Sequence, residues 1–401
     1  MSASVPQPNL PARTRVAVIG GGPAGLLLAL ILTRAGIECV VLERRSRDYV
    51  LSRIRAGVLE QGTTDLLRMA GAGARMDREG LVHDGFDIAW RGDKLHIDLR
   101  SLTGGKTVTV YGQTEVTHDL YDALDEAGVP IVHEAENVAP QDVTGDAPFV
   151  SFDTAAGSHR LDCDFVAGCD GFHGVCRQTI PADKLETFER VYPFGWLGIL
   201  VRKPPIQEEL IYANHARGFA LCSLRSPQLS RYYIQCRADD DIANWPDARF
   251  YDELQARLPP AVAGHLQRGE SIEKSIAPLR SFVAEPMHYG RMFLAGDAAH
   301  IVPPTGAKGL NLAVSDVHYL STALIAHYND HDETLLDAYS ETALARVWKA
   351  ERFSWWFTSM IHRFEDDGSF GQRIQEAEFD FLASSTAAQT ALAENYVGLP
   401  F

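Results

Sequence analysis

Apolar runs separated by glycines and charges divide the first part of the chain into predicted strands and a helix. The β-branched run at residues 15–19 is typical of a buried parallel strand. The apolar stretch at residues 26–35 predicts a helix, which Gly36 ends, and residues 39–42 predict a second strand. Strand, helix and strand in this order predict an α/β fold built on a parallel sheet.

Later in the chain the pattern changes twice. Residues 219–225 alternate in polarity and residues 231–236 are rich in aromatic and β-branched side chains, which predicts strands of a mixed sheet. Between about residues 335 and 390 the apolar spacing becomes helical. Core packing explains the aromatic residues in this region, and so does a homodimer face. They are Trp348, Phe353, Trp355, Trp356 and Phe357.

Composition narrows the possible functions. The chain has 401 residues, of which 46% are hydrophobic, and its net charge of −16 disfavours nucleic acid and anionic membranes as partners. The uncharged stretch 16–33 is interrupted by Gly20-Gly21-Gly22-Pro23, so a strand, a turn and a helix explain it better than a membrane span. The six cysteines form no C-x-x-C pair and no zinc-site spacing, so we expect reduced thiols, no metal and a cytoplasmic protein.

A glycine fingerprint joins the first predicted strand to the helix. Residues 20–25 fit G-x-G-x-x-G, in which Gly20 allows a tight turn, Gly22 lets the backbone approach a pyrophosphate and Gly25 lets the helix pack on the strand. The helix N-terminus offers free N–H groups to phosphates. Glu43 ends the second strand about 20 residues on, where a carboxylate accepts bonds from ribose hydroxyls. Together these features favour a dinucleotide site over a structural turn.

Two later motifs add to the fingerprint. A predicted strand runs into Asp170-Gly171, and another runs into Gly296-Asp297 before the segment 303–311 leads into a helix. Each motif alone is an ordinary turn. The ordered trio resembles the flavoprotein aromatic hydroxylase family, which implies bound FAD, with Asp297 on the ribitol chain and the helix from Gly309 aimed at the flavin ring.

The resemblance implies an α/β (α+β) fold, in which a Rossmann-like FAD-binding domain is interleaved with a mixed-sheet substrate domain and followed by a C-terminal helical region. We expect the following organisation: 1–14, a flexible extension; 15–185, FAD-binding, with a substrate-domain insertion near 81–99; 186–274, substrate-binding; 275–334, FAD-binding; 335–401, helical and dimerising. The implied FAD contacts are Gly20, Gly22, Pro23, Ala24, Gly25, Glu43, Arg44, Arg53, Arg55, Gln113, Asp170, Arg231, Gly296, Asp297, Lys308, Gly309, Leu310 and Asn311.

Four further segments narrow the resemblance to hydroxylases of phenolic benzoates: residues 49–62, 104–117, 192–198 and 301–312. The implied reaction is hydroxylation beside the phenol oxygen, with NADPH or NADH as reductant and O₂ activated as a flavin C4a-hydroperoxide. A sister hydroxylase of a dihydroxy- or aminobenzoate would keep every FAD motif. A flavin reductase or oxidase, or a non-catalytic flavin protein, would not need the substrate residues described next.

The resemblance places the substrate carboxylate at Ser223, Arg225 and Tyr233. Ser223 and Arg225 would share one face of an alternating strand, which suits a hydroxyl and a guanidinium clasping a carboxylate. By pattern alone, an Arg two residues from a Ser is more often part of a solvated strand face.

At the phenol end the resemblance places Tyr212, with Tyr396 behind it and His83 at the end of a proton relay. Removing the phenol proton activates the neighbouring ring carbon. The Pro304 carbonyl is expected near the carbon that is hydroxylated. His83 would otherwise be an ordinary core or surface histidine.

The reductant is expected in a groove, because the resemblance implies no second nucleotide domain. Two guanidiniums directly after Glu43 suit a 2′-phosphate, which favours NADPH, although surface ion pairs explain them too. The implied contacts are Arg44, Arg45, Tyr49, Arg55, His173 and Arg280.

Overall fold

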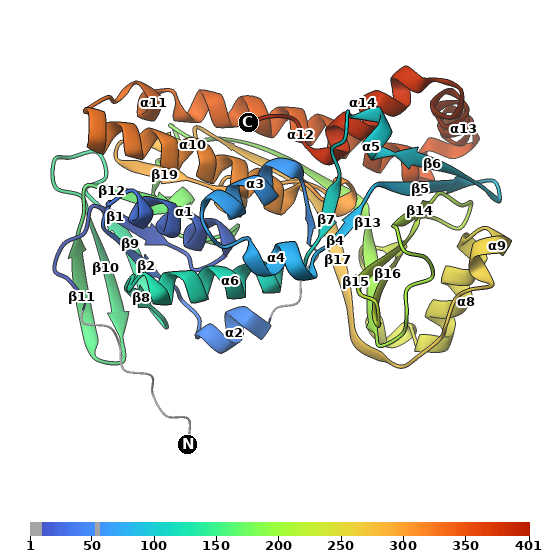
Figure 1. The fold of residues 1–401 in the computed structure, drawn as a ribbon, viewed down its shortest axis with the longest axis horizontal. Helices are drawn as coiled ribbons and strands as arrows, with labels where there is room; N and C mark the ends of the chain where they lie inside the picture. Colours follow the sequence, from blue (N-terminus) through green and yellow to red (C-terminus); the bar gives the residue numbers. More distant parts are fainter. Residues whose placement is uncertain (1–9, 53–56) are drawn as a thin grey trace.

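The computed structural model describes residues 10–52 and 57–401, and it confirms the predicted α/β class. A six-stranded sheet forms the half that carries the glycine fingerprint (Figure 1). Its strands in pairing order are β18 (His288–Tyr289), β19 (Met292–Leu294), β12 (Phe165–Gly168), β1 (Val16–Ile19), β2 (Cys39–Leu42) and β8 (Ile131–Val132). All but β18 run parallel, and β12, β1 and β2 are buried throughout, which accounts for their unbroken apolar sequences.

Three helices pack together beside this sheet. The fingerprint helix α1 (Pro23–Arg34) contacts both α6 (Gln113–Glu126) and α10 (Gly309–Asp330). Pro23 occupies the first turn of α1, where its missing N–H costs no hydrogen bond. The apolar residues of α1 enter one core together with those of β1 and β2, which fixes the N-terminus of α1 at the carboxyl edge of the sheet.

An eight-stranded mixed sheet forms the other half of the molecule. Its strands in pairing order are β20 (His300–Ile301), β17 (Ser271–Glu285), β13 (Glu186–Val201), β16 (Leu229–Arg237), β15 (Ala220–Ser226), β14 (Ile211–Ala213), β5 (Gly85–Trp90) and β6 (Asp93–Asp98). Alternate residues face two separate cores: Cys222 packs with α8 (Asp247–Arg257), whereas Leu221 packs with α12 (Tyr339–Ile361) and α14 (Thr386–Val397).

Two three-stranded sheets and short helices complete the fold. One sheet consists of β3 (Val58–Leu59), β7 (Val108–Val110) and β4 (Leu81–His83), and the other of β11 (Gly157–Asp162), β10 (Phe149–Thr154) and β9 (Glu136–Gln141), at the end of the molecule opposite α8 (Figure 1). The remaining helices are α2 (Arg47–Ser52), α3 (Gln61–Met69), α4 (Ala74–Glu79), α5 (Leu99–Leu102), α7 (Cys176–Thr179), η1 (Ile242–Asn244), α9 (Pro260–Ala263), η2 (Gly296–Ala298), η3 (Pro304–Gly306), α11 (Thr334–Asp337), η4 (Glu365–Asp367) and α13 (Gly368–Ser384).

The structure differs from the expected organisation at three places. The boundary expected at 274/275 falls inside β17, which pairs with β13 along almost its full length. Of the insertion expected near 81–99, β5 and β6 join the eight-stranded sheet, whereas β4 pairs with β7 in a small sheet. Contacts also begin before residue 15, because Thr14 is buried and donates its backbone N–H to Asp162.

The late aromatic cluster is divided between the core and the surface. Phe353 and Phe357 are buried, while Trp348 and Trp355 are 41% and 45% exposed, so core packing explains only part of the cluster. Within the described ranges, no helix combines the length and apolarity that a bilayer crossing needs. The described side chains also contain no group of three or more His, Cys, Asp and Glu residues arranged to hold a metal ion.

Candidate functional site

The glycine fingerprint forms a cradle at the N-terminus of α1. A Cβ added at Gly20 would overlap the carbonyl of Cys169, and one added at Gly25 would overlap the carbonyl of Gly20, so both positions require glycine. A Cβ at Gly22 would meet nothing within 4 Å. The first N–H groups of α1 therefore open onto space beside Gly22, as a bound pyrophosphate requires.

Glu43 braces this cradle. Its carboxylate accepts the backbone N–H of Gly21 at 2.7 Å and that of Arg45 at 2.7 Å. A carboxylate has about four acceptor positions, so these two bonds leave capacity for ribose hydroxyls. Arg44 is exposed beside it, and Gln113 is half-buried at the first position of α6.

Asp170 and Gly296 bring the two later motifs to the same edge of the sheet. One oxygen of Asp170 accepts the Cys176 N–H at 2.9 Å, while the other is buried without a hydrogen-bond partner among the described residues. Burial raises the pKa of Asp170. Gly296 lies between Ala24 and the helix α10, and Asp297 next to it is exposed. The unpaired Asp170 oxygen fits a hydroxyl donor of FAD, and the open N-terminus of α1 fits its pyrophosphate.

The N-terminus of α10 is open, but two side chains expected to contact FAD there are held by the protein. A Cβ at Gly309 would meet nothing within 4 Å. The ammonium group of Lys308 donates to Glu60 at 2.6 Å and to the backbone carbonyls of Asn395 and Tyr396. The amide of Asn311 bonds to the backbone of Glu60, Val58 and Ala307 and to Thr63. Here the backbone of residues 309–311, including the half-buried Leu310, is available to a flavin ring.

Lys308 also reveals a partner that the sequence did not indicate. The Glu60 carboxylate forms ion pairs with both Lys308 and Arg346. The distance from the Arg346 guanidinium to the carboxylate is 3.1 Å, and all three side chains are buried. This network joins α3, α10 and α12 to the segment that carries Tyr396. No local pattern predicts it, because its members come from distant parts of the chain.

The expected substrate residues lie on one face of the eight-stranded sheet. Tyr212 is opposite Leu221, which is opposite Tyr233, so the two tyrosines occupy one row across β14, β15 and β16. Ser223 lies in the next row, opposite Arg231. Residues two apart on a strand are separated by about 6.8 Å, a spacing comparable to a para-substituted benzene ring. Ser223 and Arg225 both lie on β15, where the pairing with β16 shifts register at Arg225, and the Arg225 guanidinium lies 3.3 Å from the Ser223 hydroxyl.

The clasp at the end of β15 has spare donor capacity. Arg225 donates to the Ser223 hydroxyl at 3.3 Å, and this hydroxyl donates to the Arg231 carbonyl at 3.0 Å. The Nε of Arg225 is buried without a partner among the described residues. Burial lowers the pKa of Arg225, partly opposed by the Tyr233 hydroxyl. A buried cation with an unpaired donor is stabilised by an anionic ligand.

Arg231, expected to contact FAD, is held within the sheet. It forms an ion pair with Glu273 at 2.9 Å and stacks on the ring of Tyr233, 5.0 Å from its centroid. Its Nε is buried and has no hydrogen-bond partner in the described part of the chain.

Tyr212 and Tyr396 meet at the other end of this face. Their hydroxyl oxygens are 2.8 Å apart and both side chains are buried. Phe86 stacks on Tyr396 at 4.2 Å and packs edge-on against Tyr212 at 5.6 Å. Burial, followed by the neighbouring Tyr396 hydroxyl, raises the pKa of Tyr212 well above its usual value, and burial raises that of Tyr396. The pair is therefore two neutral hydroxyls that can exchange a proton.

Among the described residues, neither His83 nor Pro304 makes a hydrogen bond with the tyrosine pair. His83 is buried on β4, and its Nδ1 has no hydrogen-bond partner among the described residues. Burial lowers the pKa of His83 to about 4, so the ring is neutral near pH 7. Pro304 is exposed, and its carbonyl accepts the N–H of Ala307 at 3.0 Å within η3.

The expected reductant contacts form two groups. Arg45 and Tyr49 are exposed, with the guanidinium 5.1 Å from the ring centroid. His173 and Arg280 both pack against Phe172, at 5.0 and 4.9 Å, and Arg280 forms an ion pair with Glu189 at 3.2 Å. Phe172 was not anticipated, although it directly follows the Asp-Gly motif. Arg53 and Arg55 lie outside the described residues.

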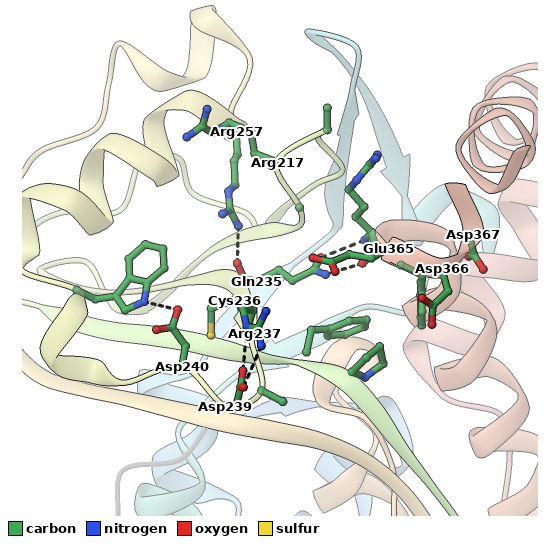
Figure 2. Close-up of a pocket in the computed structure, with 18 of the residues that line it drawn as sticks. Arg217, Gln235, Cys236, Arg237, Asp239, Asp240, Arg257, Glu365, Asp366 and Asp367 are labelled. Carbon is green, nitrogen blue, oxygen red and sulfur yellow. Dashed lines mark hydrogen bonds and ion pairs between the residues drawn. The ribbon is translucent and has the colours of Figure 1, made fainter. Parts of the chain in front are cut away.

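A cavity of about 890 Å³ opens between the middle of β13, the C-terminal end of β16 and the η4 turn (Figure 2). Its described lining contains none of the expected cofactor, substrate or catalytic residues. Two arginines in its wall are already paired, Arg237 with Asp239 and Arg257 with Glu253. These pairs leave the substrate face of β14–β16 as the better candidate for the chemistry.

Comparison with known proteins finds relatives that are similar to this chain in sequence and in fold. Residues 13–354 match the family described as an FAD binding domain. The p-hydroxybenzoate hydroxylase of Acinetobacter baylyi is 57% identical over 97% of this chain and 96% of its own length. The para-nitrophenol 4-monooxygenase of a Pseudomonas species is 28% identical over 81% of both chains. A crystal structure of p-nitrophenol 4-monooxygenase from Pseudomonas putida superposes with a TM-score of 0.80 at 22% identity, covering 98% of this chain and all of that one.

Proposed function

The chain belongs to the flavoprotein aromatic hydroxylases of the FAD-binding-domain family, and from that premise we propose that it hydroxylates 4-hydroxybenzoate at C3. The product is 3,4-dihydroxybenzoate, and the co-substrates are NAD(P)H and O₂. The observation that carries the proposal is the single sheet face that holds Ser223 and Arg225 at one end and the Tyr212–Tyr396 pair at the other.

The residues of the chain would divide the work between binding and proton transfer. Arg225 and Ser223 would bind the carboxylate, so that the phenol group lies at Tyr212. Tyr212 would accept the phenol proton and pass it to Tyr396, since their oxygens are 2.8 Å apart. The neutral His83, with its unpaired nitrogen, is suited to take that proton onward.

FAD would be held by the α1 cradle, Glu43, Asp170, the Gly296–Asp297 turn and the N-terminus of α10. When bound, it supplies the two-electron chemistry that couples NAD(P)H oxidation to activation of O₂. Phe86 and the other apolar neighbours of the tyrosine pair would exclude water from the phenol end.

For the reductant we propose NADPH, with NADH as the weaker alternative. Arg44 and Arg45 are both exposed next to Glu43 and are suited to a 2′-phosphate, with Tyr49 beneath Arg45. His173 and Arg280 would lie near the nicotinamide end, around Phe172.

We also propose that the protein is a homodimer. Phe188, Val191, Trp348 and Trp355 are each more than a third exposed, and Phe188 packs on Trp348 at 5.4 Å. Exposed large apolar side chains gathered along β13 and α12 fit the core of an interface. Light scattering of the wild type and a Trp355→Arg variant tests this: a monomeric wild type would contradict it.

The experiment that tests the function is NADPH consumption by the FAD-bound protein in air, with and without 4-hydroxybenzoate. Strong stimulation with an equal yield of 3,4-dihydroxybenzoate is the expected result. Peroxide in place of product would mean that the ligand triggers reduction but is not the substrate. Absence of stimulation would reject 4-hydroxybenzoate, and a series of dihydroxy- and aminobenzoates with both reductants would then identify the substrate.

A further inference from the structure

A buried ion pair ties α10 to the turn that carries Asp297. His300 and Asp316 are 1% and 0% exposed as side chains, and the Nε2 of His300 lies 2.6 Å from the Oδ2 of Asp316. The same Oδ2 accepts the backbone N–H of Gly296 at 2.8 Å. One carboxylate oxygen on α10 thus holds both ends of the segment 296–300.

Other bonds also hold this turn: the N–H of Ala299 donates to the Gly296 carbonyl at 2.8 Å, and Arg177 donates to the Ala298 carbonyl at 2.6 Å. Gly296 has a φ of +63°, a conformation that side-chain-bearing residues rarely adopt, and η2 contains only three residues. Gly296 is also packed between Ala24 and Ala313, so the turn sits between the fingerprint helix and α10. Asp316 is the side chain that bonds both ends of this turn to α10.

The charges around the pair support an ionised state. Burial lowers the pKa of His300, but the carboxyl groups of Asp316, Asp297 and Glu351 together outweigh burial, and the pKa is raised. A buried carboxylate is tolerated when a cation and hydrogen-bond donors surround it. Here the imidazolium and the Gly296 N–H both bond to Oδ2, while Oδ1 is buried without a hydrogen-bond partner among the described residues.

We propose that Asp316, together with His300, is a positioning residue for FAD that holds the Gly296–Asp297 turn in the shape that receives the ribityl chain. The proposal rests on the FAD site of the proposed function. Neither residue needs to touch the cofactor. The alternative is a pair that stabilises the fold and leaves cofactor affinity unchanged.

The test is the FAD affinity of the apoprotein, measured by quenching of flavin fluorescence during titration. Asp316→Asn keeps the shape and removes the charge. The dissociation constant is expected to rise at least about tenfold, since hydrogen bonds to charged groups are the stronger ones. The visible spectrum of the bound flavin is expected to change as well, which a purely fold-stabilising pair would not cause.

Asp87→Asn is the matched control. Asp87 is also a buried carboxylate beside a histidine, with His96 at 3.1 Å, but it lies on β5 in the other sheet. Its loss should lower the unfolding midpoint and leave the FAD dissociation constant within about twofold of the wild type.

His300→Gln is the second variant, and it decides the question if Asp316→Asn does not fold. It keeps a donor for Asp316 but cannot carry charge, so a smaller rise in the dissociation constant is expected. Folded variants that bind FAD as tightly as the wild type would overturn the positioning role and leave the proposed function intact. Failure of the wild-type apoprotein to bind FAD would instead overturn the proposed function.

Discussion

Two sets of buried polar groups lie in this molecule in different chemical forms. Beside the Gly296–Asp297 turn, His300 and Asp316 form an ion pair, and Glu351 is buried near them. At the phenol end of the substrate face, Tyr212 and Tyr396 are neutral hydroxyls enclosed by aromatic rings. Fixed charge pairs suit a place where a cofactor must be held still, whereas neutral hydroxyls suit a place where a proton must move.

Disrupting the glycine cradle should have the largest effect of the changes considered. The effect should be on FAD binding and on the stability of the FAD-binding half. In Gly25→Ala the new Cβ would overlap the Gly20 carbonyl, so we expect loss of FAD binding and destabilisation of about 3 kcal/mol. Gly22→Ala is the matched variant, because its Cβ meets only open space. It should keep the unfolding midpoint of the apoprotein and weaken FAD binding. Denaturant unfolding and FAD titration of both apoproteins check this, and equal stability of the two would contradict it.

Removing one hydroxyl from the tyrosine pair should affect chemistry alone. Tyr396→Phe interrupts the proposed relay, so hydroxylation should slow by about 10²- to 10⁴-fold while FAD and substrate still bind. Tyr251→Phe is the control, since Tyr251 is a buried tyrosine on α8 whose hydroxyl donates to the Gly269 carbonyl at 3.0 Å. Single-turnover rates measure the difference. A rate in Tyr396→Phe equal to that of the control would rule out the relay.

Glu351 should make the FAD side less stable as pH rises. Burial raises its pKa from 4.5 to about 7, so the folded state holds this proton more tightly than the unfolded state does. The stability from the protonated form is present below pH 4.5 and is lost as pH rises to about 7, by up to about 3 kcal/mol. Glu351→Gln should remove this loss. Unfolding free energies of variant and wild type, compared from pH 4.5 to 8, should diverge in that window.

The contribution of His83 to the unfolding free energy should depend on pH in the opposite direction. Burial lowers its pKa from 6.5 to about 4, so the unfolded state binds the proton more tightly. Stability is full above pH 6.5 and is lost as pH falls towards 4, again by up to about 3 kcal/mol. His83→Gln should remove this acid loss and leave the Glu351 dependence. If Glu351→Gln and His83→Gln changed the unfolding free energy in the same pH range, the predicted contrast between the two regions would be wrong.

The smallest effect is expected at the exposed arginines. Arg45→Ala should raise KM for NADPH by about threefold to tenfold and leave KM for NADH unchanged, since an exposed charge is screened by salt. Steady-state kinetics with both reductants at two ionic strengths check this. An equal change for NADH would remove the argument for a 2′-phosphate.

The parts of the site that the sequence predicted are those with local determinants. The cradle at Gly20 and Gly25 needs only a strand, a tight turn and a helix in succession, and the structure has them in this order, with the helix beginning at Pro23 and not at residue 26. Ser223 and Arg225 are two residues apart on β15, and their side chains are in hydrogen-bond contact. Both predictions depend on neighbours within a few residues.

The parts that the sequence did not predict depend on distant segments. Glu60 meets Lys308 across 248 residues, and Asp316 meets Gly296 only because α10 packs beneath the turn. The internal bonds of Lys308 and Asn311 could not be anticipated, because a motif identifies a segment and not the direction of each side chain. Likewise, the domain boundary expected at 274/275 is wrong because β17 continues across it to residue 285.

The ladder between β13 and β17 bears on how this protein can diversify. These strands pair from Glu186 and Glu285 at one end to Val201 and Ser271 at the other, and β17 then pairs with β20 beside the cofactor turn. A recombination event that transferred residues 186–274 as a cassette would cut β17 and leave its residues 275–285 without the partner strand to which they are fitted. New substrate ranges should therefore arise from point substitutions on β14, β15 and β16 within an inherited frame, and not from exchange of a whole substrate-binding module.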